Sequence, residues 1–269
     1  MKPIKVVVRG VSGRMGREVL STLCRVPELV PVGAIEKTVT EEYLPLPDGS
    51  RLIPFSSDVA SLLQKSGPHV MVDFTVAGAV MAGIREAASQ HVNLVIGTTG
   101  LSQKDLDEID RRCQANGVGA VVAPNFAIGA VLMIHLAKIA ARFLDYAEII
   151  EMHHEQKVDA PSGTALTTAR EMVKARGKAF VLPTTAKYLL KGTRGGQMDG
   201  ISMHSVRLPG LVAHQEVILG TLGQTLSIRH DSTSRESFMP GVVLAIKRVI
   251  GMKGLVFGLD KLLGLKEEP

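Results

Sequence analysis

The sequence contains no tryptophan and only two cysteines, and aromatic residues make up 4% of its 269 positions. So few aromatic side chains argue against a stacking surface for single-stranded nucleic acid. Cys24 and Cys113 lack metal-ligand spacing, so we expect two free thiols and no metal site. No Lys/Arg run resembles a nucleic-acid tail, and no apolar run reaches transmembrane length. The sequence therefore predicts neither a nucleic-acid partner nor a membrane partner.

What is present is a mildly basic globular chain, with a net charge of +5 and 45% hydrophobic residues. That charge fits an ordinary soluble protein, or a site that attracts anions such as dinucleotide phosphates and dicarboxylates. The first residues lead directly into an apolar strand pattern and contain no signal-peptide core. Together with the two cysteines, this predicts a reducing, cytoplasmic setting.

The first half of the chain alternates between short apolar runs and longer helical patterns, which predicts βαβ units and a Rossmann-like parallel sheet. We expect strands at 4–8, 29–35, 69–74, 93–96 and 118–123, the last closing the series, and helices at 14–25, 79–91 and 102–115. Ser102 with Asp105 resembles a capping box. Residues 38–51, rich in proline and acidic residues, read as a surface loop.

The pattern changes after Pro124 and predicts a second, α+β domain with a mixed or antiparallel sheet. We expect helices at 128–144 and 162–176, a strand at 147–152, and alternating strands over 201–231 with turns at 209–210 and 222–223. A last helix at 242–250 is expected to pack back on the first domain. The predicted division is 1–126 plus 240–269 for dinucleotide binding, and 127–239 for substrate binding.

A glycine-rich turn, Gly10-Val11-Ser12-Gly13-Arg14-Met15-Gly16, follows the first expected strand and opens a helix. It departs from the common G-x-G-x-x-G pattern, because Ser12 stands where the second glycine would be. A helix N-terminus offers free N–H groups and a positive dipole end to a pyrophosphate. The glycines alone would equally describe a tight strand-to-helix turn.

Glu36 favours the dinucleotide interpretation, because it ends the second expected strand where an acid would accept hydrogen bonds from an adenosine ribose. Lys37 follows it, and Arg14 lies in the turn. A cation there would pair with a 2′-phosphate, so the sequence predicts use of NADH, NADPH or both. In isolation, Lys37 also fits a solvated surface lysine.

Two further segments follow expected strands: Gly97-Thr98-Thr99-Gly100 and Ala123-Pro124-Asn125-Phe126. The carboxyl edge of an open parallel sheet is where ligands bind. Their small and hydroxyl side chains suit close approach of a nicotinamide, although ordinary turn chemistry explains either segment equally well.

His153 and His154 follow an expected strand of the second domain, and Lys157 and Asp159 come soon after. Adjacent strand residues point to opposite faces, so both histidines can face one pocket only if the strand has ended. This density of proton carriers predicts acid–base chemistry. Zinc is not expected, because no further ligand has suitable spacing.

Ser162 is a good N-cap for the helix that follows, and the amides of Gly163 and Thr164 would form an anion site suited to a carboxylate. A simple capped helix is the alternative. Arg235 would be either a second carboxylate clamp or a surface arginine at a helix start.

The turn Val8–Gly16, the Gly97–Gly100 loop, Asn125-Phe126 and the long motif Glu151–Ala165 together resemble the dihydrodipicolinate (4-hydroxy-tetrahydrodipicolinate) reductase family, in order over essentially the whole chain. The resemblance implies reduction of a cyclic hydroxy-dicarboxylate to tetrahydrodipicolinate, with loss of water, in the diaminopimelate route to lysine. It implies NADH or NADPH as cofactor, and a homotetramer joined through the second-domain sheets.

The resemblance also implies roles for individual residues. His153 would donate or accept a proton, and Lys157 would donate one. The implied substrate-binding residues are His154, Ser162, Gly163 and Thr164. Arg235 is a further candidate, from its charge and position rather than from the resemblance. The implied cofactor-binding residues are Gly10, Val11, Ser12, Gly13, Arg14, Met15, Glu36, Lys37, Gly97, Thr98, Thr99, Ala123, Pro124, Asn125 and Phe126. Val76-Ala77-Gly78 departs from the family pattern by lacking a frequent basic residue, which leaves the cofactor preference open.

Three alternatives remain at this point. One is another two-domain nicotinamide oxidoreductase that acts on a small carboxylate. Another is a hydrolase with Ser162 as nucleophile, although no Gly-x-Ser-x-Gly elbow is present. The third is a non-catalytic dinucleotide sensor.

Overall fold

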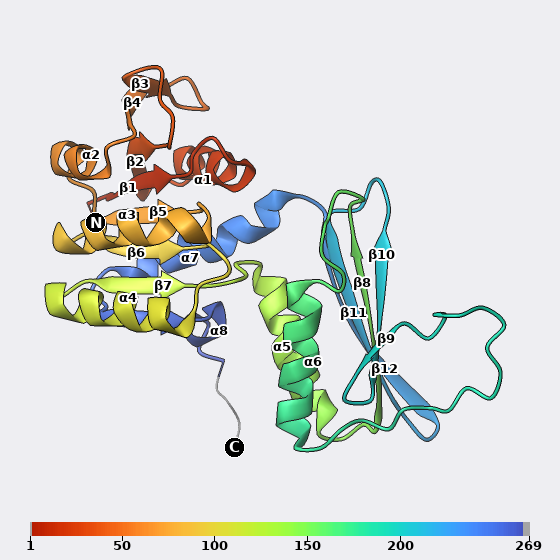
Figure 1. Ribbon diagram of the computed structural model, residues 1–269. Helices are drawn as coiled ribbons and strands as arrows, with labels where there is room; N and C mark the ends of the chain where they lie inside the picture. Colours follow the sequence, from red (N-terminus) through yellow and green to blue (C-terminus); the bar gives the residue numbers. More distant parts are fainter. Residues whose placement is uncertain (1, 266–269) are drawn as a thin grey trace. The chain divides into compact units, whose positions relative to one another are not determined.

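The computed structural model describes residues 2–265 and divides the chain into two compact units (Figure 1). One unit contains the chain up to Phe126 and from Phe238 onwards, and the other is Ala127–Ser237. The second boundary lies at Phe238 rather than at the expected residue 240.

The first unit is built on a sheet with the strand order β13-β7-β6-β5-β1-β2-β4-β3, parallel throughout except between β3 and β4. Its central strands are nearly continuous apolar runs, as expected where both faces of a parallel sheet are covered. They are β1 (Ile4–Arg9), β2 (Leu29–Ile35), β5 (Val70–Asp73), β6 (Asn93–Ile96) and β7 (Gly119–Val122). In this sheet, β2 lies on one side of β1, and β5, which comes later in the chain, lies on the other side of β1. The switch point of this topology therefore lies between β1 and β5.

Helices cover this sheet, with α3 and α4 in front of it and α7 behind it in Figure 1. The Ser102–Asp105 capping box predicted for α4 is confirmed, since each side chain bonds the other residue's backbone N–H. Cys24 and Cys113 are free and lie in helices, as predicted. The helices of this unit are α1 (Arg14–Arg25), α2 (Val59–Ser66), α3 (Ala77–Ser89), α4 (Gln103–Asn116), α7 (Met239–Val249) and α8 (Leu259–Leu262).

Two predictions for the first sheet were wrong. Residues 38–51 are not loop throughout, because β3 (Tyr43–Pro45) pairs antiparallel with β4 (Leu52–Ser56). A three-residue edge strand that contains proline carries almost no periodic signal. Strand 118–123 does not close the sheet either, because β13 (Gly254–Phe257) pairs with it from the far end of the chain.

Helix positions also shifted. The helix expected at 79–91 begins at Ala77, where Val76 provides no side-chain cap to mark the start, and ends at Ser89. The helix expected to reach residue 144 ends at Ala141.

The second unit has a mixed sheet with the order β12-β11-β8-β10-β9, which confirms the predicted sheet type. Only β8 and β10 are parallel neighbours among its described pairs. Helices α5 (Ile128–Ala141) and α6 (Gly163–Arg176) pack together and share a core with one face of the sheet. The strands are β8 (Tyr146–His153), β9 (Gly196–Met198), β10 (Ile201–Arg207), β11 (Ala213–Thr221) and β12 (Gln224–Ser232).

Among residues 2–265, no helix is both long and apolar enough to span a membrane.

Candidate active site

The glycine-rich turn between β1 and α1 has a distinct use for each glycine. Gly10 has a φ of +79°, which a side chain rarely adopts, and Gly13 is the N-cap residue of α1. A Cβ on Gly16 would lie 2.1 Å from the carbonyl oxygen of Gly10, so α1 can approach the turn only with glycine there. The first turn of α1 has no side-chain cap and no acidic residue. Its N–H groups are therefore available to an anion.

Glu36 follows β2 and closes the other side of the turn. Its carboxylate accepts hydrogen bonds from the backbone N–H groups of Ser12 and Lys37, both at 2.9 Å. Partial burial alone would raise the pKa of Glu36, but these two donors outweigh it and lower the pKa below its usual value. Glu36 is therefore ionised at neutral pH beside the turn, as an acceptor for ribose hydroxyls would be.

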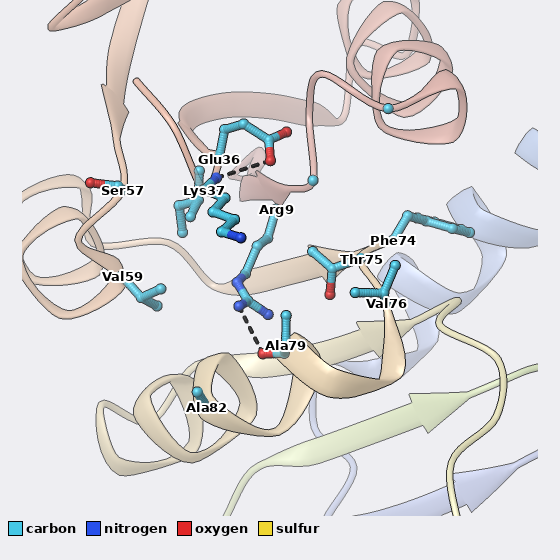
Figure 2. Close-up of a pocket in the computed structure, with 13 residues that line it drawn as sticks. Arg9, Glu36, Lys37, Ser57, Val59, Phe74, Thr75, Val76, Ala79 and Ala82 are labelled. Carbon is cyan, nitrogen blue, oxygen red and sulfur yellow. Dashed lines mark hydrogen bonds between the residues drawn. The ribbon is translucent and has the colours of Figure 1, made fainter. Parts of the chain in front are cut away.

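A cavity of about 530 Å³ opens at the carboxyl ends of β1, β2 and β5, which is the switch point of the sheet (Figure 2). Of the predicted cofactor residues, Gly10, Gly13, Glu36 and Lys37 line it. Exposed Arg14, at the start of α1, is not among its lining residues. Arg9 also lines the cavity, although the sequence motifs predicted no role for it. Figure 2 shows its side chain at the centre.

The other predicted cofactor segments directly follow β6 and β7, which are neighbouring parallel strands. The hydroxyl of buried Thr98 donates to the carbonyl oxygen of Thr75 at 3.2 Å, so the Gly97–Gly100 loop is fastened to the loop after β5. A Cβ on Gly97 would meet the ring of Phe74 at 2.0 Å, and that ring also packs on Phe126 at 5.7 Å. Gly97 is thus explained by the packing of Phe74. These segments do not line the described cavity.

In the second unit, β8 leads directly to the predicted acid–base residues. Alternation along the strand places Ala147, Ile149, Glu151 and His153 on the same face, and the first three are buried. Ala147 and Ile149 belong to the core shared with α5 and α6. Glu151 therefore lies on a core-facing position, fully buried at 0% exposure, and such a carboxylate must be hydrogen-bonded.

The partners of Glu151 include the predicted catalytic histidine. One carboxylate oxygen contacts Nδ1 of His153 at 2.5 Å, and the other accepts from the backbone N–H of Ser162 at 3.2 Å. Arg207 pairs with His153 across the parallel strands β10 and β8 and donates to both oxygens, at 2.9 and 2.7 Å. Glu151 thus joins the end of β8, the end of β10 and the start of α6.

The charge state of Glu151 determines how His153 is presented. Burial alone would raise the pKa of Glu151, but the hydrogen bonds from His153 and Arg207 reverse this effect and lower the pKa to about 2. An ionised carboxylate only accepts hydrogen bonds, so Nδ1 of His153 must carry the hydrogen. Nε2 of His153 is therefore the nitrogen left to exchange a proton with a substrate.

The other residues of the predicted cluster lie in the loop after β8. The strand ends at His153, so His154 lies outside it. The end of the strand at this point is the condition under which both histidines can face one pocket. Lys157 donates to Asp159 at 2.5 Å, and this hydrogen bond lowers the pKa of Asp159. The backbone carbonyl of Asp159 in turn accepts from Arg207 at 2.7 Å. The loop that carries Lys157 is thereby connected to the Glu151 network.

The start of α6 completes this region. The buried hydroxyl of Ser162 accepts from the N–H of Ala165 at 3.1 Å, which confirms the predicted N-cap. Gly163 and Thr164 are the first residues of the helix, and N–H groups at these positions have no acceptor within a helix. A Cβ on Gly163 would meet no atom within 4 Å, so the space beside its Cα is open.

Arg235 is separate from this network. It opens a short 3-10 helix after β12, and among the described residues no hydrogen bond or ion pair joins it to Glu151, His153 or Arg207. Sequence reasoning gave no role to Glu151, Arg207 or Arg9. The buried-face alternation along β8 would have singled out Glu151, whereas no sequence signal places Arg207 beside it.

No group of three or more His, Cys, Asp or Glu side chains within the described residues is arranged to hold a metal ion.

A glycine turn at the switch point of a parallel sheet and a hydrogen-bonded Glu151–His153–Arg207 network at the end of a second, mixed sheet define a class of protein. They are the features of a pyridine-nucleotide-dependent reductase with a Rossmann-like unit.

The comparisons with known proteins specify the family. The models of the N-terminus and the C-terminus of dihydrodipicolinate reductase match residues 4–126 and 129–263. The 4-hydroxy-tetrahydrodipicolinate reductase of Dehalococcoides mccartyi is 58% identical over 98% of this chain and 100% of its own length. The chain belongs to the dihydrodipicolinate reductase family.

Solved structures agree with this assignment. A dipicolinate-bound dihydrodipicolinate reductase from Paenisporosarcina sp. TG-14 has a TM-score of 0.86 and 39% identity, covering 96% of this chain and 99% of that one. An amine dehydrogenase from Mycobacterium smegmatis, at 17% identity and a TM-score of 0.68, covers 99% of this chain and 98% of its own, and shares the fold alone.

Proposed function

We propose that this protein reduces 4-hydroxy-tetrahydrodipicolinate to tetrahydrodipicolinate, with loss of water, in the diaminopimelate route to lysine. Its cofactor is NADH, NADPH or both. The observation that carries the proposal is the Glu151 carboxylate, which binds Nδ1 of His153 and the N–H of Ser162 at once. A proton-carrying side chain and a carboxylate-binding helix start are thereby held in one hydrogen-bonded unit.

In this proposal, His153 exchanges a proton through Nε2, and Lys157 donates one. The amides of Gly163 and Thr164, together with His154, bind a substrate carboxylate. Glu151 and Arg207 act as positioning residues. Glu151 contacts His153, and Arg207 donates to the backbone carbonyl of Asp159 in the loop before α6. Arg235 is proposed as a second carboxylate contact, and the only support for this role is its positive charge.

The dinucleotide, when bound, supplies the hydride. The first unit fits it through the φ of Gly10, the open helix start of α1 and the ionised Glu36. We assign the pyrophosphate to the turn and the adenosine half to the cavity at the switch point.

The hydrolase alternative has little support, because the Ser162 hydroxyl is buried and already serves as the N-cap of α6. A different two-domain oxidoreductase is the alternative that an assay must exclude. Oxidation of NADH and of NADPH should be followed separately with freshly prepared 4-hydroxy-tetrahydrodipicolinate. No oxidation with this substrate, together with tight dinucleotide binding, would contradict the proposal.

The anion site can be tested with Thr164→Val. This change removes a hydroxyl beside the helix-start amides while keeping the shape of the side chain. We expect the KM for the dicarboxylate to rise and NADH affinity to stay constant. Thr167→Val, at an exposed position of the same helix, is the matched control. Weaker NADH binding with an unchanged KM would reassign the helix start to the cofactor.

Cofactor choice can be tested at Glu36 and Lys37. Lys37→Ala should weaken NADPH selectively, because a charge-assisted hydrogen bond to the 2′-phosphate contributes about 1.5–3 kcal/mol, and less at this exposed lysine. Glu36→Ala should weaken NADH selectively by removing the acceptor for the ribose hydroxyls. The measurement is kcat/KM for both cofactors, with Lys65→Ala as a charge control on α2. Parallel changes for NADH and NADPH would show that this pair does not discriminate.

We also propose a homotetramer joined through the second sheet and a cytoplasmic location. Exposed apolar side chains support the first, among them Val206 and Leu226 on that sheet and Leu222 in the turn between β11 and β12. Two free cysteines support the second. Sedimentation at several protein concentrations tests the assembly, and a monomer throughout would contradict it.

A further inference from the structure

Arg9 lines the cavity at the carboxyl ends of β1, β2 and β5, although the sequence motifs assign it no role. It is the last residue of β1, directly before the glycine turn. We propose that Arg9 presents one face of its guanidinium to the adenine ring of the dinucleotide and so acts as a fixed cation–π platform. This inference rests on the proposed function, since it assumes that the cavity takes the adenosine half.

The edges of the guanidinium are held by the protein. Nη1 of Arg9 donates to fully buried Asp73 at 2.6 Å, and Nη2 donates to the carbonyl oxygen of Ala79 at 2.9 Å. Asp73 also accepts from the backbone N–H and hydroxyl of Thr75, at 2.9 and 2.6 Å. Arg9 itself is 11% exposed. Its charge is thus paired and its orientation fixed, as in a positioned group rather than a mobile surface arginine.

One flat face of the guanidinium rests on α3. A Cβ built on Gly83 would lie 2.7, 2.8 and 2.9 Å from Nη1, Cζ and Nε of Arg9. Nearly equal distances to three atoms of a planar group mean that Gly83 meets the plane face-on. Glycine within a helix costs about 1 kcal/mol relative to alanine, so its presence in the interior of α3 is explained by this contact.

Because one face of the guanidinium rests on Gly83, we assign the opposite face to the cavity that Arg9 lines. Figure 2 shows the Arg9 side chain between the strand ends and α3, with Val59, Ala79 and Ala82 around the same space. Apolar walls and a flat cation suit an aromatic base, since a guanidinium over a ring is attracted by the ring quadrupole. Because donors on the edge of Arg9 already bond Asp73 and Ala79, the face is better placed than the edge to meet a ligand. A 2′-phosphate is left to Lys37.

Gly83→Ala is the most selective test. The added methyl group must push the guanidinium off α3, yet it removes no charge, and alanine favours the helix. Arg9→Lys is the second variant, because it keeps a cation for Asp73 but has no planar face. Gly78→Ala is the matched control, as a glycine of the same helix whose added Cβ would meet no atom within 4 Å.

Binding of NADH, NADPH and ADP-ribose should be measured by calorimetry, with NADH fluorescence as a second readout. We expect both variants to raise all three dissociation constants about 3- to 30-fold, with an unchanged ratio between NADPH and NADH. Gly78→Ala should bind like the wild type.

Two results would overturn the platform. Selective loss of NADPH would make Arg9 a 2′-phosphate contact, and unchanged affinities would make it a purely structural residue. The proposed function fails separately. The wild type could bind ADP-ribose more tightly than the Arg9→Lys variant and yet fail to reduce the dicarboxylate. That result would support the role of Arg9 and overturn the reductase assignment.

Discussion

His153→Ala and Lys157→Ala are each expected to lower kcat about 10²- to 10⁴-fold, the usual contribution of a general acid or base. The physical reason is that both side chains belong to the proton-carrying network of the second unit, whereas the glycine turn and Glu36 belong to the first. NADH affinity should therefore change far less than kcat. Steady-state kinetics and NADH calorimetry on the same preparations provide the two numbers.

Lys174→Ala is the control for these variants, because it removes an exposed lysine in the last turn of α6. It should keep the wild-type kcat. If His153→Ala or Lys157→Ala weakened NADH binding as much as it lowered kcat, the role assigned to that residue would be wrong.

Glu151→Gln is expected to affect both catalysis and stability. The amide keeps the shape of the carboxylate but loses the charge that fixes Nδ1 of His153 and pairs with Arg207. Loss of a charge-assisted hydrogen bond of about 1.5–3 kcal/mol predicts a fall in kcat of about 10- to 100-fold. Breaking a buried ion pair predicts a free energy of unfolding lower by about 3–5 kcal/mol. A changed pH profile of kcat would separate positioning of His153 from simple destabilisation.

The stability difference should depend on pH in a defined direction. The pKa of Glu151 is lowered from 4.5 to about 2, so its carboxylate stabilises the folded protein fully above pH 4.5. That contribution is lost as the pH falls from 4.5 towards 2, because protons bind the unfolded carboxyl first. The difference between wild type and Glu151→Gln, measured by denaturant unfolding, should shrink over this window.

Glu148→Gln is the control on the same strand. Glu148 pairs with Arg194 and His204, but its side chain is 32% exposed. Exposed pairs contribute about 0–1 kcal/mol, so this variant should change stability little and kcat not at all. A pH-independent difference for Glu151→Gln would show that folding does not lower the pKa of Glu151.

Much of the first unit is determined by the sequence itself. Its strands are short apolar runs that alternate with helices, and that local pattern was enough to predict the parallel sheet, the glycine turn and Glu36 at the end of β2. The cap at Ser162 was likewise local, because the side chain bonds a backbone N–H three residues away. The edge strands β3 and β13 escaped prediction because pairing, not pattern, creates them.

The tertiary structure alone decided which charges meet. Arg207 reaches Glu151 across 56 residues because β10 and β8 are parallel neighbours in a fixed register. Arg9 reaches Asp73 across 64 residues for the same reason in the first sheet, where β1 pairs with β5. A sequence shows which residues can carry a charge or a proton, because that is a property of each side chain. Which of them are buried together depends on strand order, and strand order is decided by burial of the whole apolar surface.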